Sequence, residues 1–258
     1  MLSRMRFALL IAYDGTDFVG WWRQPGTRTV AGVFDEAFAR IGEPHAQVVG
    51  ASRTDAGVHA EGQVAHVTTA RTWDADELRR ALATHLPGDV ACRAISAVAD
   101  EWDACHAASG KTYRYTIDHG DVADPFLARF SWRPPFRLDP QRLSEAAQSI
   151  AGERDWSGFS RRGETRHLDG DLVRRIERVA WTIGGPRLYC EVTGGGFTYR
   201  LVRSLVGAMV AVANDTCSRA DLTAALDGHE SPAGRQQAPA RGLCLVQVGY
   251  ASAIFIRS

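Results

Sequence analysis

The sequence has few cysteines, almost no lysine and no long uninterrupted apolar run. Its five cysteines are scattered and form no Cys-x-x-Cys pair, so neither a zinc site nor a disulfide framework is indicated. No apolar run approaches the length of a membrane-spanning helix, which argues against a membrane protein. The apolar stretch 7–12 is followed by Tyr13-Asp14-Gly15 rather than by a small-residue cleavage site. We therefore interpret it as a strand and expect a cytoplasmic protein.

The chain also lacks a surplus of positive charge. Its 30 basic and 30 acidic residues give a formal net charge of zero, whereas a basic surplus is the usual footprint of nucleic-acid binding. Of the basic residues, 29 are arginines and only Lys111 is a lysine. Arginine binds phosphate with two hydrogen bonds and stacks on bases, but a GC-rich genome would enrich arginine equally well. Binding to RNA then requires the positive charge to gather on one face.

A chain of 258 residues can form one large domain or two smaller ones. Strands and helices alternate in two successive halves, 1–108 and 109–258, in an order typical of ferredoxin-like units. The hydrophobic spacing and the capping residues predict helices over 29–41, 74–86, 139–150, 198–213 and 222–226. Alternating or continuous apolar residues predict strands over 7–13, 46–51, 90–98, 111–118, 175–183, 188–192 and 243–248, and a further strand that begins at Val64 after the Asp55 loop. We expect the least order over 159–171 and 229–240, which are rich in charge, Gly and Pro.

One short loop carries the most specific pattern. The segment Arg53-Thr54-Asp55-Ala56-Gly57-Val58-His59-Ala60, followed by Gly62-Gln63, places an acid between two apolar stretches. An Asp followed by Ala-Gly favours a loop, and a loop on a rigid scaffold can expose a functional carboxylate. Arg53 and His59 could bias the charge and position of that carboxylate. On this pattern alone, however, a structural Asx-turn closed by Asp55 is the more common arrangement.

This loop resembles the signature loop of the tRNA pseudouridine synthase A (TruA) family, and the similarity extends from Phe7 to about Tyr250. The other segments that carry it are Tyr13-Asp14-Gly15-Thr16 with Phe18, Gly20-Trp21 and Arg23-Gln24, then Leu86-Pro87-Gly88-Asp89-Val90, Lys111-Thr112-Tyr113-Arg114-Tyr115, Phe197-Thr198-Tyr199-Arg200-Leu201-Val202-Arg203 with Gly207, and Arg241-Gly242-Leu243-Cys244-Leu245. The chain departs from the family pattern at Ser52, Cys105-His106, Arg200 and Leu201. None of these departures falls on the loop Asp, on Tyr113 or on Arg203.

The resemblance implies a fold and a function. The fold is α+β, with two ferredoxin-like halves that share one largely antiparallel sheet, helices on one side, and an active-site cleft between the halves. The function is isomerisation of uridine to pseudouridine at positions 38–40 in the anticodon stem-loop of tRNA. The resemblance also implies a homodimer that grips one tRNA across both subunits.

The resemblance assigns Asp55 the role of catalytic nucleophile. Arg203 would form an ion pair with Asp55, Tyr113 would stack on the target base, and Leu245 would be an apolar wall against that base. From the residues alone, the spacing of Arg203 favours a solvated surface arginine. Tyr113 could belong to a core aromatic pair with Tyr115, and Leu245 could be ordinary core packing.

Two further arginines are candidates for contact with RNA. Arg53 would hold a phosphate of the flipped-out nucleotide or fill the gap that the nucleotide leaves, because such enzymes must unstack their target. Arg23 would also contact the RNA. The Trp21-Trp22 pair next to Arg23 favours packing over a base-stacking platform.

The reaction constrains the cofactor. Conversion of uridine to pseudouridine moves one bond and neither gains nor loses atoms, so we expect no cofactor and no metal. His59 and His66 alone are too few ligands for a zinc site. The reaction needs a carboxylate, a held base and exclusion of solvent. Whether Asp55 attacks C1′, attacks C6 or removes a ribose proton stays open.

Two other functions remain as alternatives. The first is a non-catalytic RNA-binding ferredoxin-like protein, which the absence of an Arg-Gly-Phe-type RNP stretch disfavours. The second is a hydrolase with an Asp nucleophile, which would need a paired acid. Glu61 and Glu101 are not placed by any motif to supply it.

Overall fold

A computed structural model describes residues 4–160 and 172–255, so most of the segment 159–171 lies outside the described residues. The chain divides into two compact units, Met1–Ser109 with Cys244–Ser258, and Gly110–Leu243. The sequence pattern instead predicts that residues 244–258 belong to the second half. They group with the first unit because the last strand pairs in parallel with residues of that unit, Cys244 opposite His59 and Leu245 opposite Ala60.

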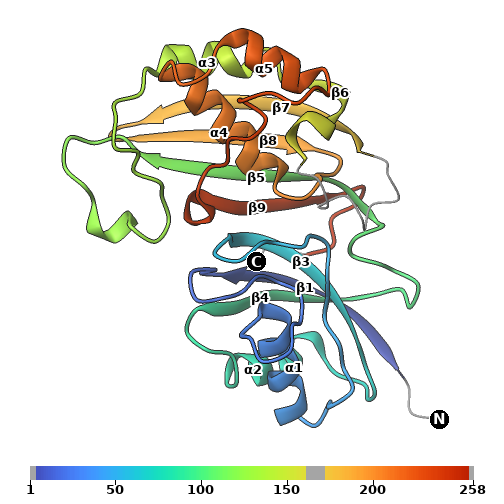
Figure 1. Cartoon of the computed structure of the whole chain (residues 1–258). Helices are drawn as coiled ribbons and strands as arrows, with labels where there is room; N and C mark the ends of the chain where they lie inside the picture. The colour runs from blue at the N-terminus through green and yellow to red at the C-terminus, as the bar shows by residue number, and fades with distance from the viewer. Residues whose placement is uncertain (1–3, 161–171, 256–258) are drawn as a thin grey trace. The chain divides into compact units, whose positions relative to one another are not determined.

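The first unit has the β-α-β-β-α-β order of a ferredoxin-like unit (Figure 1). Its elements are β1 (Met5–Tyr13), α1 (Val30–Arg40), β2 (Val49–Gly50), β3 (His59–Thr69), α2 (Ala75–Ala83) and β4 (Val90–Val98), joined by most of β9 (Leu243–Tyr250). Strand β1 lies between β3 and β4, antiparallel to both, and β2 is antiparallel to β3.

The second unit contains four strands and three α-helices among its described residues. They are β5 (Ala108–Asp118), α3 (Pro140–Ala147), β6 (Gly152–Asp155), β7 (Val173–Gly184), β8 (Arg187–Gly194), α4 (Leu201–Ala213) and α5 (Arg219–Leu226). The strands pair antiparallel in the order β5-β8-β7-β6. Figure 1 shows α3, α4 and α5 together on one face of these strands.

These elements confirm the expected fold class, a mixed α+β protein whose strands pair mainly antiparallel. Short 3₁₀ turns at Pro125–Leu127, Trp156–Phe159 and Ala240–Gly242 complete the described regular structure. None of the helices among residues 4–160 and 172–255 is long and apolar enough to cross a membrane.

Side-chain caps explain where most helices begin. Thr29 accepts a hydrogen bond from the Gly32 N–H at the start of α1, and Asp74 accepts two at the start of α2. Asp139 caps α3, and a proline occupies its first turn. Helix α5 has a capping box between Ser218 and the acid three residues later.

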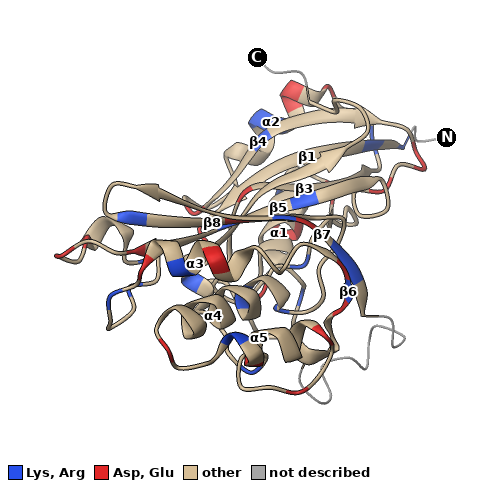
Figure 2. Ribbon diagram, turned by 90° about the horizontal axis from the view of Figure 1, so that it is seen from above, with Lys and Arg blue, Asp and Glu red and all other residues tan. Residues whose placement is uncertain are grey.

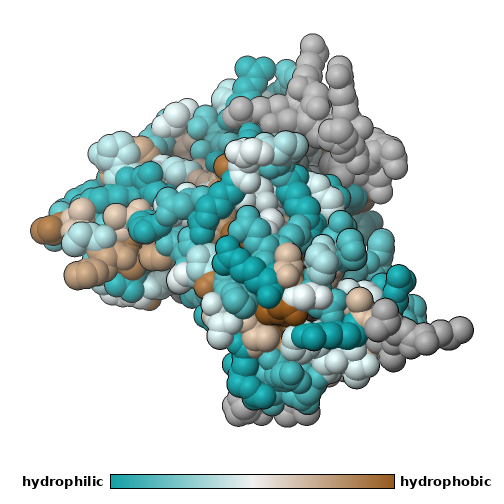
Figure 3. Space-filling view, turned by 90° about the horizontal axis from the view of Figure 1, so that it is seen from below, coloured by the Kyte–Doolittle hydropathy of each residue, from teal (hydrophilic) through white to brown (hydrophobic). Residues whose placement is uncertain are grey.

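Each unit has its own apolar core. In the first unit the largest fully buried side chains on β1, α1 and α2 are Phe7, Leu9, Ile11, Phe34, Phe38, Leu78 and Leu82. Burial of each such side chain stabilises the fold by roughly 1.5–3 kcal/mol. The space-filling view in Figure 3 is mainly hydrophilic, with apolar side chains confined to small areas. Figure 2 shows basic and acidic residues interspersed along the ribbon of both units.

Candidate active site

Asp55 lies, half-buried, in the loop between β2 and β3, as the sequence predicted. Two backbone hydrogen bonds tie this loop to the segment that follows β1. The N–H of Trp21 donates to the carbonyl of Thr54 (3.1 Å), and the N–H of Gly57 donates to the carbonyl of Phe18 (3.2 Å). Because these bonds flank Asp55 on both sides, the backbone that carries the carboxylate is fixed.

The close approach of these two segments depends on glycine. Gly20 has a left-handed φ of +101°, and a Cβ there would come within 2.7 Å of the Thr54 carbonyl oxygen. A Cβ at Gly15 would lie only 2.0 Å from the Val58 carbonyl oxygen. Any side chain at either position would therefore displace the loop that carries Asp55.

Buried polar groups hold the same loop from inside the unit. The hydroxyl groups of Tyr13 and Thr54 are hydrogen-bonded at 2.8 Å. The fully buried amide of Gln63 donates to the Ser52 carbonyl (2.6 Å) and accepts from the Ser52 N–H (3.2 Å). Ser52 departs from the family pattern, but its backbone is held by hydrogen bonds to the Gln63 side chain. Loss of one such buried partner typically costs about 1–3 kcal/mol.

The two histidines near this loop both have hydrogen-bonding roles. The His59 Nδ1 accepts from the Gly15 N–H (3.0 Å) and also lies 3.2 Å from an Asp14 carboxylate oxygen. The His66 Nδ1 accepts from the Ala104 N–H (3.1 Å), and burial lowers the pKa of His66. Among the described residues, no group of three or more His, Cys, Asp or Glu side chains could hold a metal ion.

The two candidate RNA-contacting arginines differ in their partners. Arg23 is paired with the carboxylate of Asp35 through two of its nitrogens. The exposed Arg53 places its guanidinium 4.9 Å from the ring centroid of Trp22. Trp21 is fully buried and packs in the core, whereas Trp22 is 44% exposed and lies at the surface. No pattern in the sequence indicates the contact of Arg23 with Asp35 or of Arg53 with Trp22.

Leu245 lies on β9, opposite Ala60 of β3, and is fully buried. That position is compatible with core packing, and its role as a wall against a base stays a prediction.

Tyr113 and Tyr115 of β5 are both buried, as the alternation of a strand predicts for residues on one face. The Tyr113 ring meets the ring of Phe197 edge-on, with centroids 5.2 Å apart. The Tyr115 hydroxyl donates to the Pro239 carbonyl (2.8 Å). Burial raises the pKa of Tyr115, and the nearby charge of Arg203 partly opposes that rise. The charge of the half-buried Arg203 therefore acts on the buried Tyr115 within the second unit.

Arg203 stands out on α4, because every other residue of that helix is buried. Its Nε donates to the Ala238 carbonyl (2.9 Å) and its Nη2 to the Gln237 side-chain oxygen (3.4 Å). The Ala238 N–H in turn donates to the Arg203 carbonyl (2.9 Å). Arg203 is thus half-buried and held at defined points, unlike a solvated surface arginine.

These contacts correct the expectation of little order over 229–240. Residues 237 and 238 pack against α4 at Gly207, where a Cβ would come within 2.7 Å of the Gln237 nitrogen. Ala233 and Ala238 are fully buried. The charge and proline content of 229–240 does not predict this order, because the order comes from packing against α4, which lies elsewhere in the sequence.

Arg200, a departure from the family pattern, has a left-handed backbone (φ 58°) directly before α4. Its guanidinium lies 4.5 Å from the ring centroid of Tyr199, which is 45% exposed. A left-handed backbone is unfavourable for a residue other than glycine.

The predicted site residues therefore fall in both units. Asp55, Arg53, Arg23 and Leu245 belong to the first unit, and Tyr113 and Arg203 to the second. The ion pair between Asp55 and Arg203, and the cleft between the halves, stay predictions.

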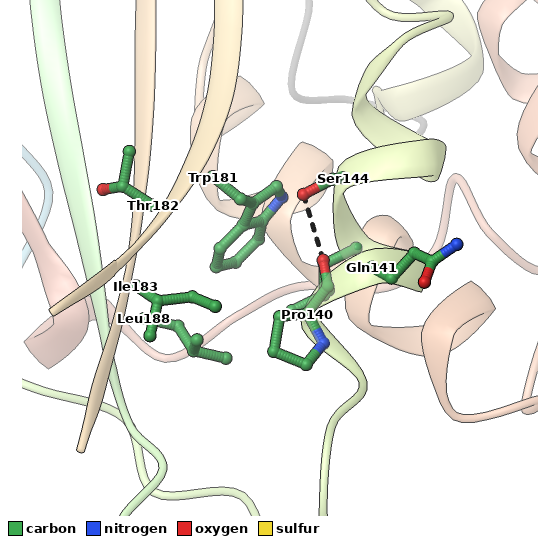
Figure 4. Close-up of a pocket in the computed structure, with 8 residues that line it drawn as sticks. Pro140, Gln141, Ser144, Trp181, Thr182, Ile183 and Leu188 are labelled. Atoms are coloured by element: carbon green, nitrogen blue, oxygen red, sulfur yellow. Dashed lines mark hydrogen bonds between the residues drawn. The ribbon is translucent and has the colours of Figure 1, made fainter. Parts of the chain in front are cut away.

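A separate pocket of about 460 Å³ lies in the second unit, between the start of α3 and strands β7 and β8. Pro140 on one side faces Trp181, Ile183 and Leu188 on the other (Figure 4). None of the predicted site residues lines this pocket.

Comparison with known proteins extends the agreement to nearly the whole chain. The family model described as "tRNA pseudouridine synthase" matches residues 9–106 and 146–251. A "tRNA pseudouridine synthase A" of Syntrophotalea carbinolica is 37% identical, covering 94% of this chain and 95% of the relative. Proteins of the same name from Synechococcus sp. (36% identical, 99% and 87% covered) and Brevibacillus brevis (35%, 95% and 99%) are similarly close. With a matching model over most of its length and relatives above a third identical, the chain belongs to the tRNA pseudouridine synthase A family and is an isomerase of that kind.

Proposed function

We propose that this protein isomerises uridine to pseudouridine at positions 38–40 of the tRNA anticodon stem-loop, with Asp55 as the nucleophile. The observation that carries the proposal is the loop 53–60, whose sequence matches the family signature and whose backbone is clamped on both sides of Asp55. A rigid loop that presents a half-buried carboxylate suits a group that must meet one atom of a bound nucleotide.

The chemistry assigns each predicted residue a task. The bond between C1′ and N1 of uridine breaks, a bond between C1′ and C5 forms, a proton leaves C5 and N1 gains one. Asp55 would start this exchange at C1′, at C6 or at a ribose proton. Arg203 would keep the carboxylate ionised and oriented. Tyr113 and Leu245 would hold the detached base.

We also propose that two subunits grip one tRNA, as a homodimer working in the cytoplasm. Arg53 supports RNA binding directly, because it is exposed and enters none of the ion pairs recorded within residues 4–160 and 172–255. Arg23, held by Asp35, would contribute less.

The proposal is tested by mapping pseudouridine in tRNA from cells that lack this protein. We expect pseudouridine to disappear from positions 38–40 and to return on expression of the wild-type protein but not of Asp55→Asn. Unchanged modification at those positions in the deletion strain would contradict the assigned substrate.

Excess chelator should leave activity unchanged, because the reaction exchanges bonds within one nucleotide and needs no Lewis acid. The measurement is pseudouridine formation in tRNA before and after incubation with EDTA, with refolding of the RNA controlled separately by its melting curve. Loss of activity that zinc alone restores would instead point to a metal site.

Binding of tRNA should weaken steeply with salt despite the zero net charge. Each phosphate that the protein neutralises releases counterions, which gives a log–log slope of about −0.7 to −0.9 per contact. With several arginine contacts, affinity should fall on the order of tenfold or more between low and moderate salt. Filter binding across a salt series measures this, and a flat response would favour a smaller ligand.

A further inference from the structure

Trp22 is an exposed aromatic side chain beside the loop that carries Asp55. It is 44% exposed, although the adjacent Trp21 is fully buried. An exposed tryptophan ring offers a broad apolar face with a polar edge, which suits a flat partner.

The backbone directly before this residue is anchored. The Trp21 N–H donates to the Thr54 carbonyl (3.1 Å), and the Trp21 carbonyl accepts from the Ala31 N–H (3.0 Å). Trp22 therefore follows a residue that is bonded to the neighbour of Asp55 on one side and to α1 on the other. A partner on its ring would lie close in the chain to this anchor on the Asp55 loop.

The charges around the ring indicate the chemistry of that partner. The guanidinium carbons of Arg53 and Arg23 lie 4.9 Å and 5.9 Å from the ring centroid. Asp35 neutralises Arg23, whereas no ion pair among the described residues involves Arg53. This surface thus combines the aromatic face of Trp22 with the unneutralised cation of Arg53. A matching partner has a planar group that lies on the ring and a negative charge close to that group. A nucleotide has both features.

We propose that an unpaired base of the RNA substrate stacks on the Trp22 ring while Arg53 contacts an adjoining phosphate. This inference rests on the proposed function, since it takes RNA as the substrate. Stacking of bases on aromatic side chains tolerates any base, so Trp22 would add affinity rather than choose the target uridine.

The experiment measures the affinity of the full-length protein for an anticodon stem-loop RNA, for wild type and for Trp22→Leu and Trp22→Phe. Trp22→Leu should weaken binding about tenfold, in line with the loss of one base–aromatic stack. Trp22→Phe keeps an aromatic face and should stay within about threefold of wild type. Phe126→Leu, at an 89% exposed aromatic of the second unit, is the matched control and should bind as wild type.

The salt dependence separates the two parts of the contact. Trp22→Leu should lower affinity at every salt concentration without changing the log–log slope, whereas Arg53→Gln should reduce the slope by about 0.7, one single-strand phosphate contact. Equal binding by wild type and Trp22→Leu would overturn the inference. So would a changed oligomeric state of Trp22→Leu in light scattering, because the ring would then serve a second copy of the chain. If wild type itself neither binds nor modifies the RNA, the proposed function fails instead.

Discussion

Replacing Asp55 with asparagine should reduce pseudouridine formation on the order of a thousandfold or more while leaving tRNA affinity within about twofold. The amide keeps the shape of the side chain, so the loop and its hydrogen bonds to Trp21 and Phe18 should persist. It cannot act as a nucleophile or as a base. The measurement is single-turnover pseudouridine formation together with filter binding of the same tRNA.

Asp100→Asn is the matched control, because Asp100 is an exposed aspartate of the same unit. It should retain wild-type activity and affinity. Residual turnover by Asp55→Asn within tenfold of wild type would remove Asp55 from the chemistry.

Replacing Arg203 with lysine should lower activity about a hundredfold, the scale expected for loss of one oriented charged donor. A lysine keeps the positive charge but cannot reproduce the planar guanidinium geometry. The melting temperature should change far less than activity does. The substitution affects the bonds of only one half-buried side chain, those to Gln237 and Ala238. Turnover and thermal unfolding of the same preparation separate the two effects.

The variant Arg203→Ala carries a second readout. The acid limb of its pH–rate profile should move to higher pH, because a carboxylate without its cation takes up a proton more readily. Arg142→Lys, at an exposed ion pair with Asp215 on the same unit, should change neither activity nor the profile. An Arg203→Ala protein with wild-type activity and an unmoved acid limb would contradict the ion pair with Asp55.

Local signals predicted most of the secondary structure. Thr29, Asp74 and Asp139 begin their helices as expected, because capping depends on neighbouring residues alone. Helix α4 begins at Leu201 rather than at residue 198, since Arg200 adopts a left-handed backbone. Helix α5 begins earlier than expected, at Arg219, because Ser218 and Asp221 form a capping box there.

Long-range contacts account for what the sequence could not supply. The strand expected over 46–51 shrinks to Val49–Gly50, and the Val48 carbonyl accepts from the Arg23 side chain (3.2 Å) instead. The partners of Gln63 and Arg53 likewise lie many residues away. No hydrophobic period or turn pattern encodes such pairs. The loop around Asp55 could be predicted from the sequence, but the hydrogen bonds that hold this loop could not.

The most direct test of Asp55 and its reaction uses an anticodon stem-loop RNA with uridine at positions 38, 39 and 40, incubated with purified protein. Mass spectrometry of the digested RNA, with site mapping, follows the fate of each uridine. We expect pseudouridine at these positions with wild type, no conversion with Asp55→Asn, and no free uracil with either. Release of free uracil would identify a hydrolase, and intact uridine with bound wild-type protein would identify a non-catalytic RNA-binding protein.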